Sequence, residues 1–168
     1  METVAIYWEP TIKTYGFNEI SDVSLVRMAS DDLAKIGSLI YDLDPVKNEF
    51  ALLWSQNDTQ NDTIGLCLGT PGKDRRHVVQ LLKQKCLSED IDFIGETYPV
   101  GLVYFHGPHY GDRYGIAETV FKTLDGKVKI IAAGFSGAAV YLVFPGDDVK
   151  TAVSLLSQTF ETPDSDNQ

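Results

Sequence analysis

The chain has 168 residues, 43% of them hydrophobic and 23% charged, and a formal net charge of −10 from 24 acidic and 14 basic residues. This length and composition suit one globular domain or two small ones. The acidic excess argues against the clustered Lys and Arg that nucleic-acid backbones and anionic membranes require, so we expect neither as a partner.

The sequence shows no targeting or membrane-spanning pattern. No apolar run reaches the roughly 18 residues of a membrane span, and Met1–Val4 has no basic stretch leading into an apolar core. Cys67 and Cys86 lack CxxC spacing. We expect buried free thiols, with a disulfide or a metal pair as the alternative. These features predict a cytoplasmic protein.

The first part of the chain predicts alternating strands and helices. Strands show apolar residues at every second position, and Ser30 is a suitable N-cap for a helix that Pro45 ends. In chain order the expected elements are strands at 3–8, 11–17 and 23–28, a turn at 18–22, a helix from Ser30, strands at 50–55 and 64–68, a helix opened by 70–74, and a strand at 91–94 before Pro99. The order from 23 to 98 is that of a split βαβ, or ferredoxin-like, unit.

The same order begins again at residue 100. The expected elements are a strand at 100–106, a helix at 114–124 with Asp112 as its N-cap, strands at 127–133 and 138–144, and a helix capped by Asp147 or Asp148. This second unit lacks a fourth strand, and an uncovered edge is unfavourable. The strand region 3–17 has no unit of its own, so we expect it to complete the second sheet.

The predicted fold class is therefore α+β, with two ferredoxin-like units whose antiparallel sheets carry helices on one face. The expected boundaries are 19–98 for the first unit and 99–162 for the second, completed by strands within 3–17. Residues 163–168 are expected to form a mobile tail.

A glycine-rich loop joins strand 100–106 to the helix that follows. Gly107, Gly111 and Gly115 allow positive φ or close backbone approach. The N–H groups at the start of a helix, with the dipole behind them, favour an anion such as a carboxylate. The alternative is a sharp turn with no ligand.

The loop GPHYGDRYGIA, followed by a helix and the stretch VKIIAAGFSGAAVYLVF, resembles the ACT domain, most closely the last regulatory ACT domain of aspartate kinases. Loops of that family usually end in Asp-Arg-Pro-Gly before Ile/Val-Ala. Here Asp112, Arg113 and Gly115 match this pattern, and Tyr114 stands where proline is common, so the residue before it is less restricted. The resemblance is clearest over 100–161.

The resemblance implies a regulatory module without a catalytic kinase domain, and hence no enzyme activity and no cofactor. It also implies that one ACT unit is inserted into the other, so that the N-terminal strand completes the sheet of the second unit. The expected ligand is an amino acid such as lysine or threonine. The expected partners are a second copy of the chain and a separate enzyme subunit. In the family a strand–helix loop of one unit faces a strand of another. The implied effector-binding residues are His109, Tyr110, Gly111, Asp112, Arg113, Tyr114, Gly115, Ile116, Ala133, Gly134, Phe135 and Ser136.

Three alternatives remain open at this stage. Gly134 and Gly137 suggest a bulge or a close backbone approach, and a tight hairpin turn at Phe135–Ser136 is the other interpretation. The module could have lost ligand binding and serve only oligomerisation or partner docking. His106, His109 and Asp112 could bind a metal, although no third imidazole or thiolate has the spacing of a metal site.

The corresponding loop of the first unit, Met28–Ala34, has no glycine and carries two adjacent carboxylates. These charges repel a ligand carboxylate. We expect this loop to be degenerate or to prefer the cationic end of a ligand.

Overall fold

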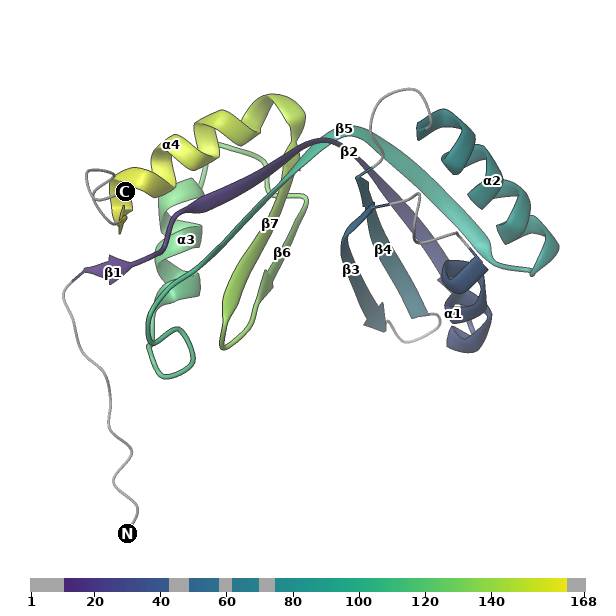
Figure 1. Ribbon diagram of the computed structural model, residues 1–168, viewed down its shortest axis with the longest axis horizontal. Coiled ribbons are helices and arrows are strands. Elements are labelled where there is room, and N and C mark those ends of the chain that lie inside the picture. Colours follow the sequence, from purple (N-terminus) through teal and green to yellow (C-terminus); the bar gives the residue numbers. More distant parts are fainter. Residues whose placement is uncertain (1–10, 43–48, 58–61, 70–74, 163–168) are drawn as a thin grey trace, which may run out of the picture. The chain divides into compact units, whose positions relative to one another are not determined.

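The computed structural model describes residues 11–42, 49–57, 62–69 and 75–162. The chain divides into two compact units, one made of residues 1–19 and 101–168 (unit 1) and one of residues 20–100 (unit 2). Unit 1 corresponds to the second unit expected from the sequence, and unit 2 corresponds to the first. Six strands follow the order β3-β4-β2-β5-β7-β6. Two long strands, β2 (Phe17–Ser30) and β5 (Asp92–His106), contribute residues to both units (Figure 1).

Unit 2 has the ferredoxin-like strand order. After β2 come α1 (Leu33–Asp42), β3 (Glu49–Asn57), β4 (Asp62–Gly69), α2 (Arg75–Ser88) and β5. The sheet order is β3-β4-β2-β5, and β4 is antiparallel to both β2 and β3. Its core joins alternate residues of β2 to one face of each helix. The buried members are Val26, Met28, Ile36, Leu39, Val78, Val79, Leu82, Cys86 and Ile91.

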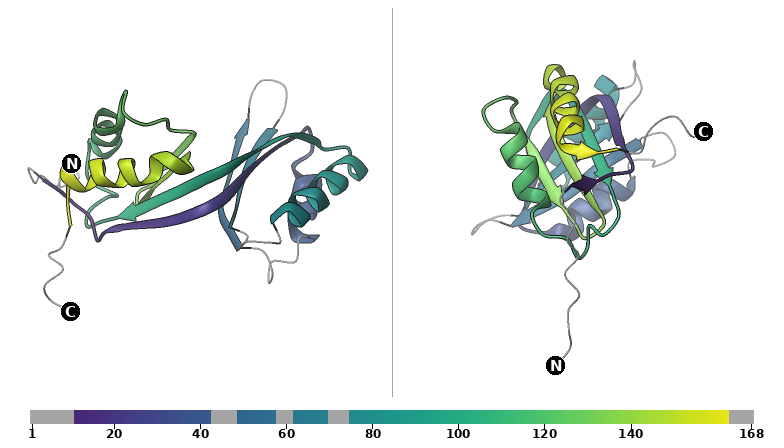
Figure 2. Two further views of the ribbon diagram at one scale, coloured as in Figure 1. Left: turned by 90° about the horizontal axis from the view of Figure 1, so that it is seen from above. Right: turned by 90° about the vertical axis from the view of Figure 1, so that its left-hand side faces the viewer.

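Unit 1 repeats this order with a strand from elsewhere in the sequence. After β5 come α3 (Ile116–Leu124), β6 (Ala132–Phe135), β7 (Ala139–Pro145), a short 3-10 turn η2 (Gly146–Asp148) and α4 (Val149–Thr159). The sheet order is β2-β5-β7-β6, so β2 occupies the fourth place. A separate parallel pair joins β1 (Ile12–Lys13) to β8 (Phe160–Glu161), at the end of α4 (Figure 2, right).

The core of unit 1 lies between its sheet and both helices. Val140, Leu142 and Phe144 alternate along β7 and therefore share one face. Ile116, Val120 and Leu124 of α3 and Val149, Ala152 and Leu156 of α4 complete the same cluster. Both helices therefore cover the same face of the sheet. The α+β fold of two ferredoxin-like units is as predicted.

Several predicted boundaries are wrong. Residues 18–22, expected as a turn, lie inside β2, where Asp22 adopts a φ of 57°. A short polar residue tolerates this conformation better than most. The strands expected at 91–94 and 100–106 form one strand, β5, that passes through Pro99. Proline removes one ladder donor but does not oblige a strand to end. The strand expected at 127–133 is shorter and later, at 132–135.

The predicted N-caps are also partly wrong. Ser30 is the last residue of β2, and the Asp32 carboxylate accepts the Ala34 N–H at 2.8 Å. Asp112 lies three residues before Gly115, which is the N-cap of α3. Asp148 does occupy the N-cap of α4, but its carboxylate accepts the Lys129 N–H.

Some predictions fall outside the described residues: the strand at 3–8, the helix opening at 70–74 and the tail at 163–168. Within the part of the chain that is described, Cys86 is a buried free thiol whose sulfur lies 3.5 Å from that of Met28. No helix among the described residues is long and apolar enough to cross a membrane.

Candidate functional site

The candidate loop spans residues 107–115, between the end of β5 and the start of α3, and lies wholly in unit 1. Gly115 adopts φ 88° and ψ 0°, a left-handed conformation that favours glycine. No side chain caps the helix, and the Gly115 carbonyl accepts the Thr119 N–H at 2.9 Å. The N–H groups of the first turn of α3 are therefore not served by a side-chain cap, which is the arrangement that attracts an anion.

Asp112 belongs to a turn inside the loop. Its N–H donates to the His109 carbonyl at 3.2 Å, and its Oδ2 lies 3.5 Å from His109 Nδ1. His109 itself adopts a φ of 63°. Both side chains are about half exposed. The turn explains why Asp112 does not cap α3, and it leaves a carboxylate and an imidazole together on the loop surface.

Tyr110 lies beneath the loop and is only 6% exposed. Its ring meets Phe105 edge-on at 6.3 Å, in the core of unit 1. Burial raises the pKa of Tyr110, and the nearby Thr14 hydroxyl and Arg113 guanidinium offset part of that rise. Among the described residues, the Tyr110 hydroxyl oxygen has no hydrogen-bond partner. Thr14 lies close to it, but the Thr14 hydroxyl donates its proton to the His106 carbonyl.

The tip of the β6–β7 hairpin meets this loop backbone to backbone. A Cβ on Gly111 would lie 3.1 Å from the Gly137 carbonyl oxygen, so both positions favour glycine. The strands pair without a register shift, and the Ser136 N–H donates to the Ala139 carbonyl at 2.9 Å. The structure therefore has the hairpin turn and not the bulge.

The predicted site residues form two neighbouring segments of one unit. Gly111 contacts the hairpin beside Ser136 through Gly137, whereas Ala133 and Gly134 lie further along β6. Tyr114 projects into solvent, with 79% of its surface exposed. The Phe135 ring lies against Phe121 of α3 at 5.3 Å. Gly137 was not among the predicted site residues, although the glycines of AAGFSGAAV predicted a close backbone approach, and Gly137 makes one with Gly111.

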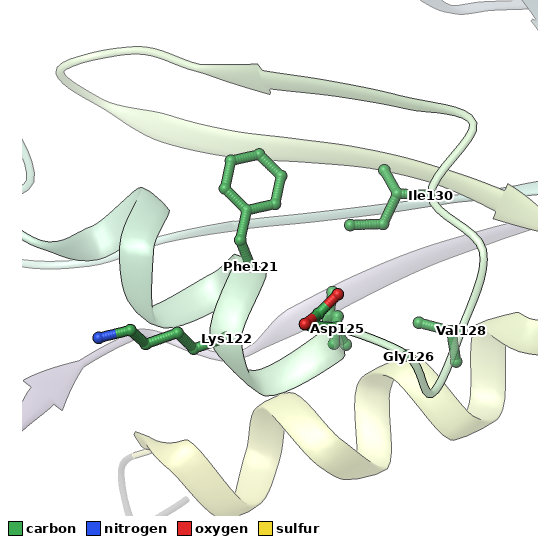
Figure 3. Close-up of a pocket in the computed structure, with 7 residues that line it drawn as sticks. Phe121, Lys122, Asp125, Gly126, Val128 and Ile130 are labelled. Carbon is green, nitrogen blue, oxygen red and sulfur yellow. The ribbon is translucent and has the colours of Figure 1, made fainter.

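A separate hollow lies beside the other end of α3 (Figure 3). It has a volume of about 380 Å³. Its lining is Phe121, Lys122, Leu124, Asp125, Gly126, Val128 and Ile130. Phe121 lines this hollow and also packs against Phe135, so Phe135 lies next to the lining of the hollow.

Metal binding has no support in the part of the chain that the structure describes. No group of three or more His, Cys, Asp or Glu side chains could hold an ion there. The His106 ring lies against Tyr15 at 5.3 Å, and His109 faces Asp112. The three residues of the metal hypothesis thus have other contacts.

No protein-family model and no curated protein matches the sequence. Solved structures match closely in fold. The regulatory subunit of aspartate kinase from Thermus thermophilus has a TM-score of 0.73 at 10% identity, covering 88% of this chain and 99% of that one. A structure of aspartokinase alpha and beta subunits has a TM-score of 0.71 at 15% identity, covering 87% and 97%.

The complete Escherichia coli aspartokinase III, in complex with lysine and aspartate, matches with a TM-score of 0.61 at 20% identity. The match covers 92% of this chain but 35% of that enzyme. This chain therefore spans about a third of the length of that enzyme. The chain has the fold of the regulatory part of aspartate kinases, with two ACT-type units.

Proposed function

We propose that this chain is a regulatory module that binds a small amino acid at the loop 109–116 of unit 1 and thereby changes its own assembly or that of a partner. The observation that carries the proposal is the start of α3, which has a left-handed Gly115 and no side-chain cap. Such a start stabilises a carboxylate by about 0.3–1 kcal/mol when exposed and by about 2 kcal/mol when partly buried.

The loop offers complementary groups for both ends of an amino acid. The first-turn amides would hold the carboxylate, and Arg113 would reinforce them by a charge-assisted hydrogen bond. Asp112, half exposed beside His109, or a backbone carbonyl would hold the ammonium group. The hairpin residues 133–136 would border the ligand from the β6 side, where Gly111 and Gly137 touch.

The fold supports this proposal without fixing the ligand. One structure of the same fold, that of E. coli aspartokinase III, was solved with lysine and aspartate. Lysine is therefore the first amino acid to test, and threonine, which the family resemblance also implies, is the second. A cytoplasmic location and the absence of a cofactor belong to the same proposal.

The open edge of the sheet supports a proposal of assembly with another chain. β6 is the outermost strand of its sheet, and Gly134 and Phe135 on it are exposed. An open edge with an exposed aromatic side chain favours pairing with another chain. A homodimer is the proposed state, and a separate enzyme subunit is the proposed regulated partner.

The deciding experiment is calorimetry and thermal shift of the folded protein against each of the twenty amino acids. We expect one or a few to bind and to raise the melting temperature by mass action. A folded sample that responds to none of them would contradict the proposal. The oligomeric state, measured with and without the binding amino acid, then tests the link to assembly.

A second function, ligand-independent docking, is favoured by two contacts of the loop. Asp112 is already placed beside His109, and the loop backbone is in contact with the hairpin at Gly137. If both contacts persist with every amino acid, the loop is a rigid structural element. Dimerisation or partner binding without any amino acid would then be the function.

A further inference from the structure

The start of the candidate loop is held by a segment about ninety positions earlier in the sequence. The carbonyl of His106, the last residue of β5, accepts two hydrogen bonds. One comes from the Thr14 hydroxyl at 2.7 Å and the other from the Tyr15 N–H at 2.9 Å. Thr14 is only 1% exposed, so neither water nor another side chain readily replaces its hydroxyl.

The same segment also packs against the next residue of the loop. A Cβ on Gly107 would overlap the Lys13 carbonyl oxygen and would lie 2.6 Å from the Tyr110 ring. Only glycine lets the chain pass between these two groups. The Tyr15 ring lies 5.3 Å from that of His106. Residues 13–15 therefore define where the loop begins and in which direction it leaves β5.

The other side of this segment is fixed to the end of α4. Ile12 and Lys13 pair with Phe160 and Glu161, and the Thr14 N–H donates to the Glu161 carbonyl at 2.8 Å. Ile12 and Phe160 are both buried in the core of unit 1. The segment is thus anchored to a stable element, which lets it hold the loop in turn.

We propose that Thr14 is a positioning residue for the candidate site: its hydroxyl, by holding the His106 carbonyl, orders the loop 107–115 before any ligand arrives. Thr14 touches no ligand group in this proposal and acts through His106 and Gly107. The link to amino-acid affinity rests on the proposed function, whereas the ordering of the loop does not.

Hydrogen–deuterium exchange of the full chain, followed by mass spectrometry, tests the ordering. In Thr14→Val, which keeps the shape but removes the hydroxyl, we expect exchange in residues 107–115 to rise about fivefold, the effect of one net hydrogen bond. Thr14→Ser keeps the hydroxyl and should exchange like the wild type. Gly37→Ala in α1, where nothing lies within 4 Å of the new Cβ, is the control for an unrelated substitution.

A second pair of variants guards against misfolding. If Thr14→Val does not fold, Thr14→Ser and Thr14→Ala still differ only by the hydroxyl, and faster loop exchange in the alanine variant alone supports the proposal. Unchanged exchange at 107–115 in a folded variant without the hydroxyl overturns it. An equal rise throughout β7 and α4 also overturns it, because that pattern reports lower stability of the whole unit.

Affinity gives the second readout. If an amino acid binds the wild type, we expect Thr14→Val to weaken its binding about fivefold and Thr14→Ser to restore it. Equal affinity in both variants overturns the positioning role. If no amino acid binds the wild type, the proposed function fails, and the exchange measurement alone decides the role of Thr14.

Discussion

Two strand-to-helix junctions occupy the same place in the two units and are built differently. In unit 2, β2 ends at Ser30 and α1 begins at Leu33. The Ser30 hydroxyl oxygen accepts the Asp32 N–H at 3.1 Å, and the Asp32 carboxylate accepts the Ala34 N–H at 2.8 Å. In unit 1 the junction is the glycine-rich loop 107–115, and no side chain caps α3.

Because of this difference, we expect the two junctions to differ in how well they bind a carboxylate. A helix start that is capped by its own carboxylate has used one of its donors, and the negative charge repels a second carboxylate. An uncapped start leaves the same donors for a ligand. The loop Met28–Ala34 of unit 2 was expected to be degenerate, and its capped helix start gives a physical reason for this expectation. The proposed ligand site therefore belongs to unit 1.

The largest test separates the units by deletion. Removing residues 1–18 takes away β1 and the beginning of β2, including Ile12 and Phe17, which pack in the core of unit 1. Their burial alone stabilises the unit by roughly 2–5 kcal/mol, a large part of a small domain's stability. We expect residues 101–162 to lose protection against hydrogen exchange while residues 20–100 keep much of theirs. If the truncated chain melts at the same temperature as the full chain, the N-terminal region does not complete the sheet of unit 1, and the proposal is refuted.

The next test changes the left-handed glycine. Gly115→Asp places a side chain at φ 88° and a negative charge at the uncapped helix start. We expect a loss of about 1–2 kcal/mol in the free energy of unfolding from the backbone conformation, with the fold retained, and complete loss of the amino-acid response. Chemical denaturation and calorimetry measure the two effects. Gly37→Ala, in an exposed helical position, is the control and should keep the amino-acid response. An unchanged response in Gly115→Asp would show that the ligand does not bind at the junction of unit 1.

The sequence predicted what depends on local pattern and missed what depends on distant contacts. The alternation of Val140, Leu142 and Phe144 and the helical spacing in α3 and α4 were sufficient for the repeated fold. Asp22 and Pro99 resemble strand ends in isolation, but β2 and β5 continue through them. Nothing local could reveal that Thr14 bonds to His106.

The same division between local pattern and distant contacts applies to the residues of the candidate site. The glycine pattern predicted the position of the loop, although the contacts that require two of these glycines come from residues distant in the sequence. Gly115 has positive φ, and Gly107 and Gly111 have backbone groups where a Cβ would be. The N-caps were misplaced because Ser30 and Asp112 are good caps in general, and the choice between neighbouring candidates depends on where the strand ends.

A smaller effect is expected from removing the cap of unit 2. Asp32→Ala deletes the carboxylate that accepts the Ala34 N–H and should lower the free energy of unfolding by about 1 kcal/mol. The same variant removes the charge that repels an anion. If a second amino-acid site then appears by calorimetry, capping rather than loop length distinguishes the junctions. Asp31→Ala, which removes the neighbouring carboxylate and leaves the bond from the Ala34 N–H to Asp32, is the matched control. An equal loss of stability there would contradict the assignment of Asp32.

The smallest effect concerns the polar groups beneath the junctions. Ser30 and Tyr110 are both 6% exposed, but Ser30 accepts a hydrogen bond and the Tyr110 hydroxyl has no partner. A buried hydroxyl without a partner is unfavourable, so Tyr110→Phe should leave the free energy of unfolding at neutral pH unchanged or raise it by up to about 1 kcal/mol.

The pH dependence gives this last prediction its sign. Burial raises the pKa of Tyr110 above its usual value of 10.0, so the folded chain retains the phenolic proton after the unfolded chain has begun to lose it. The contribution of the neutral phenol is therefore complete below pH 10 and declines as the pH rises past that value. Denaturation at pH 8 and at pH 10.5 should show a smaller loss of stability in Tyr110→Phe than in the wild type. Tyr41→Phe, at a side chain that is 84% exposed, should lose as much as the wild type. Equal losses of stability in all three proteins would mean that the Tyr110 phenol is as well solvated as one on the surface. The loop would then be more open than the contacts of the Tyr110 ring with Gly107 and Phe105 indicate.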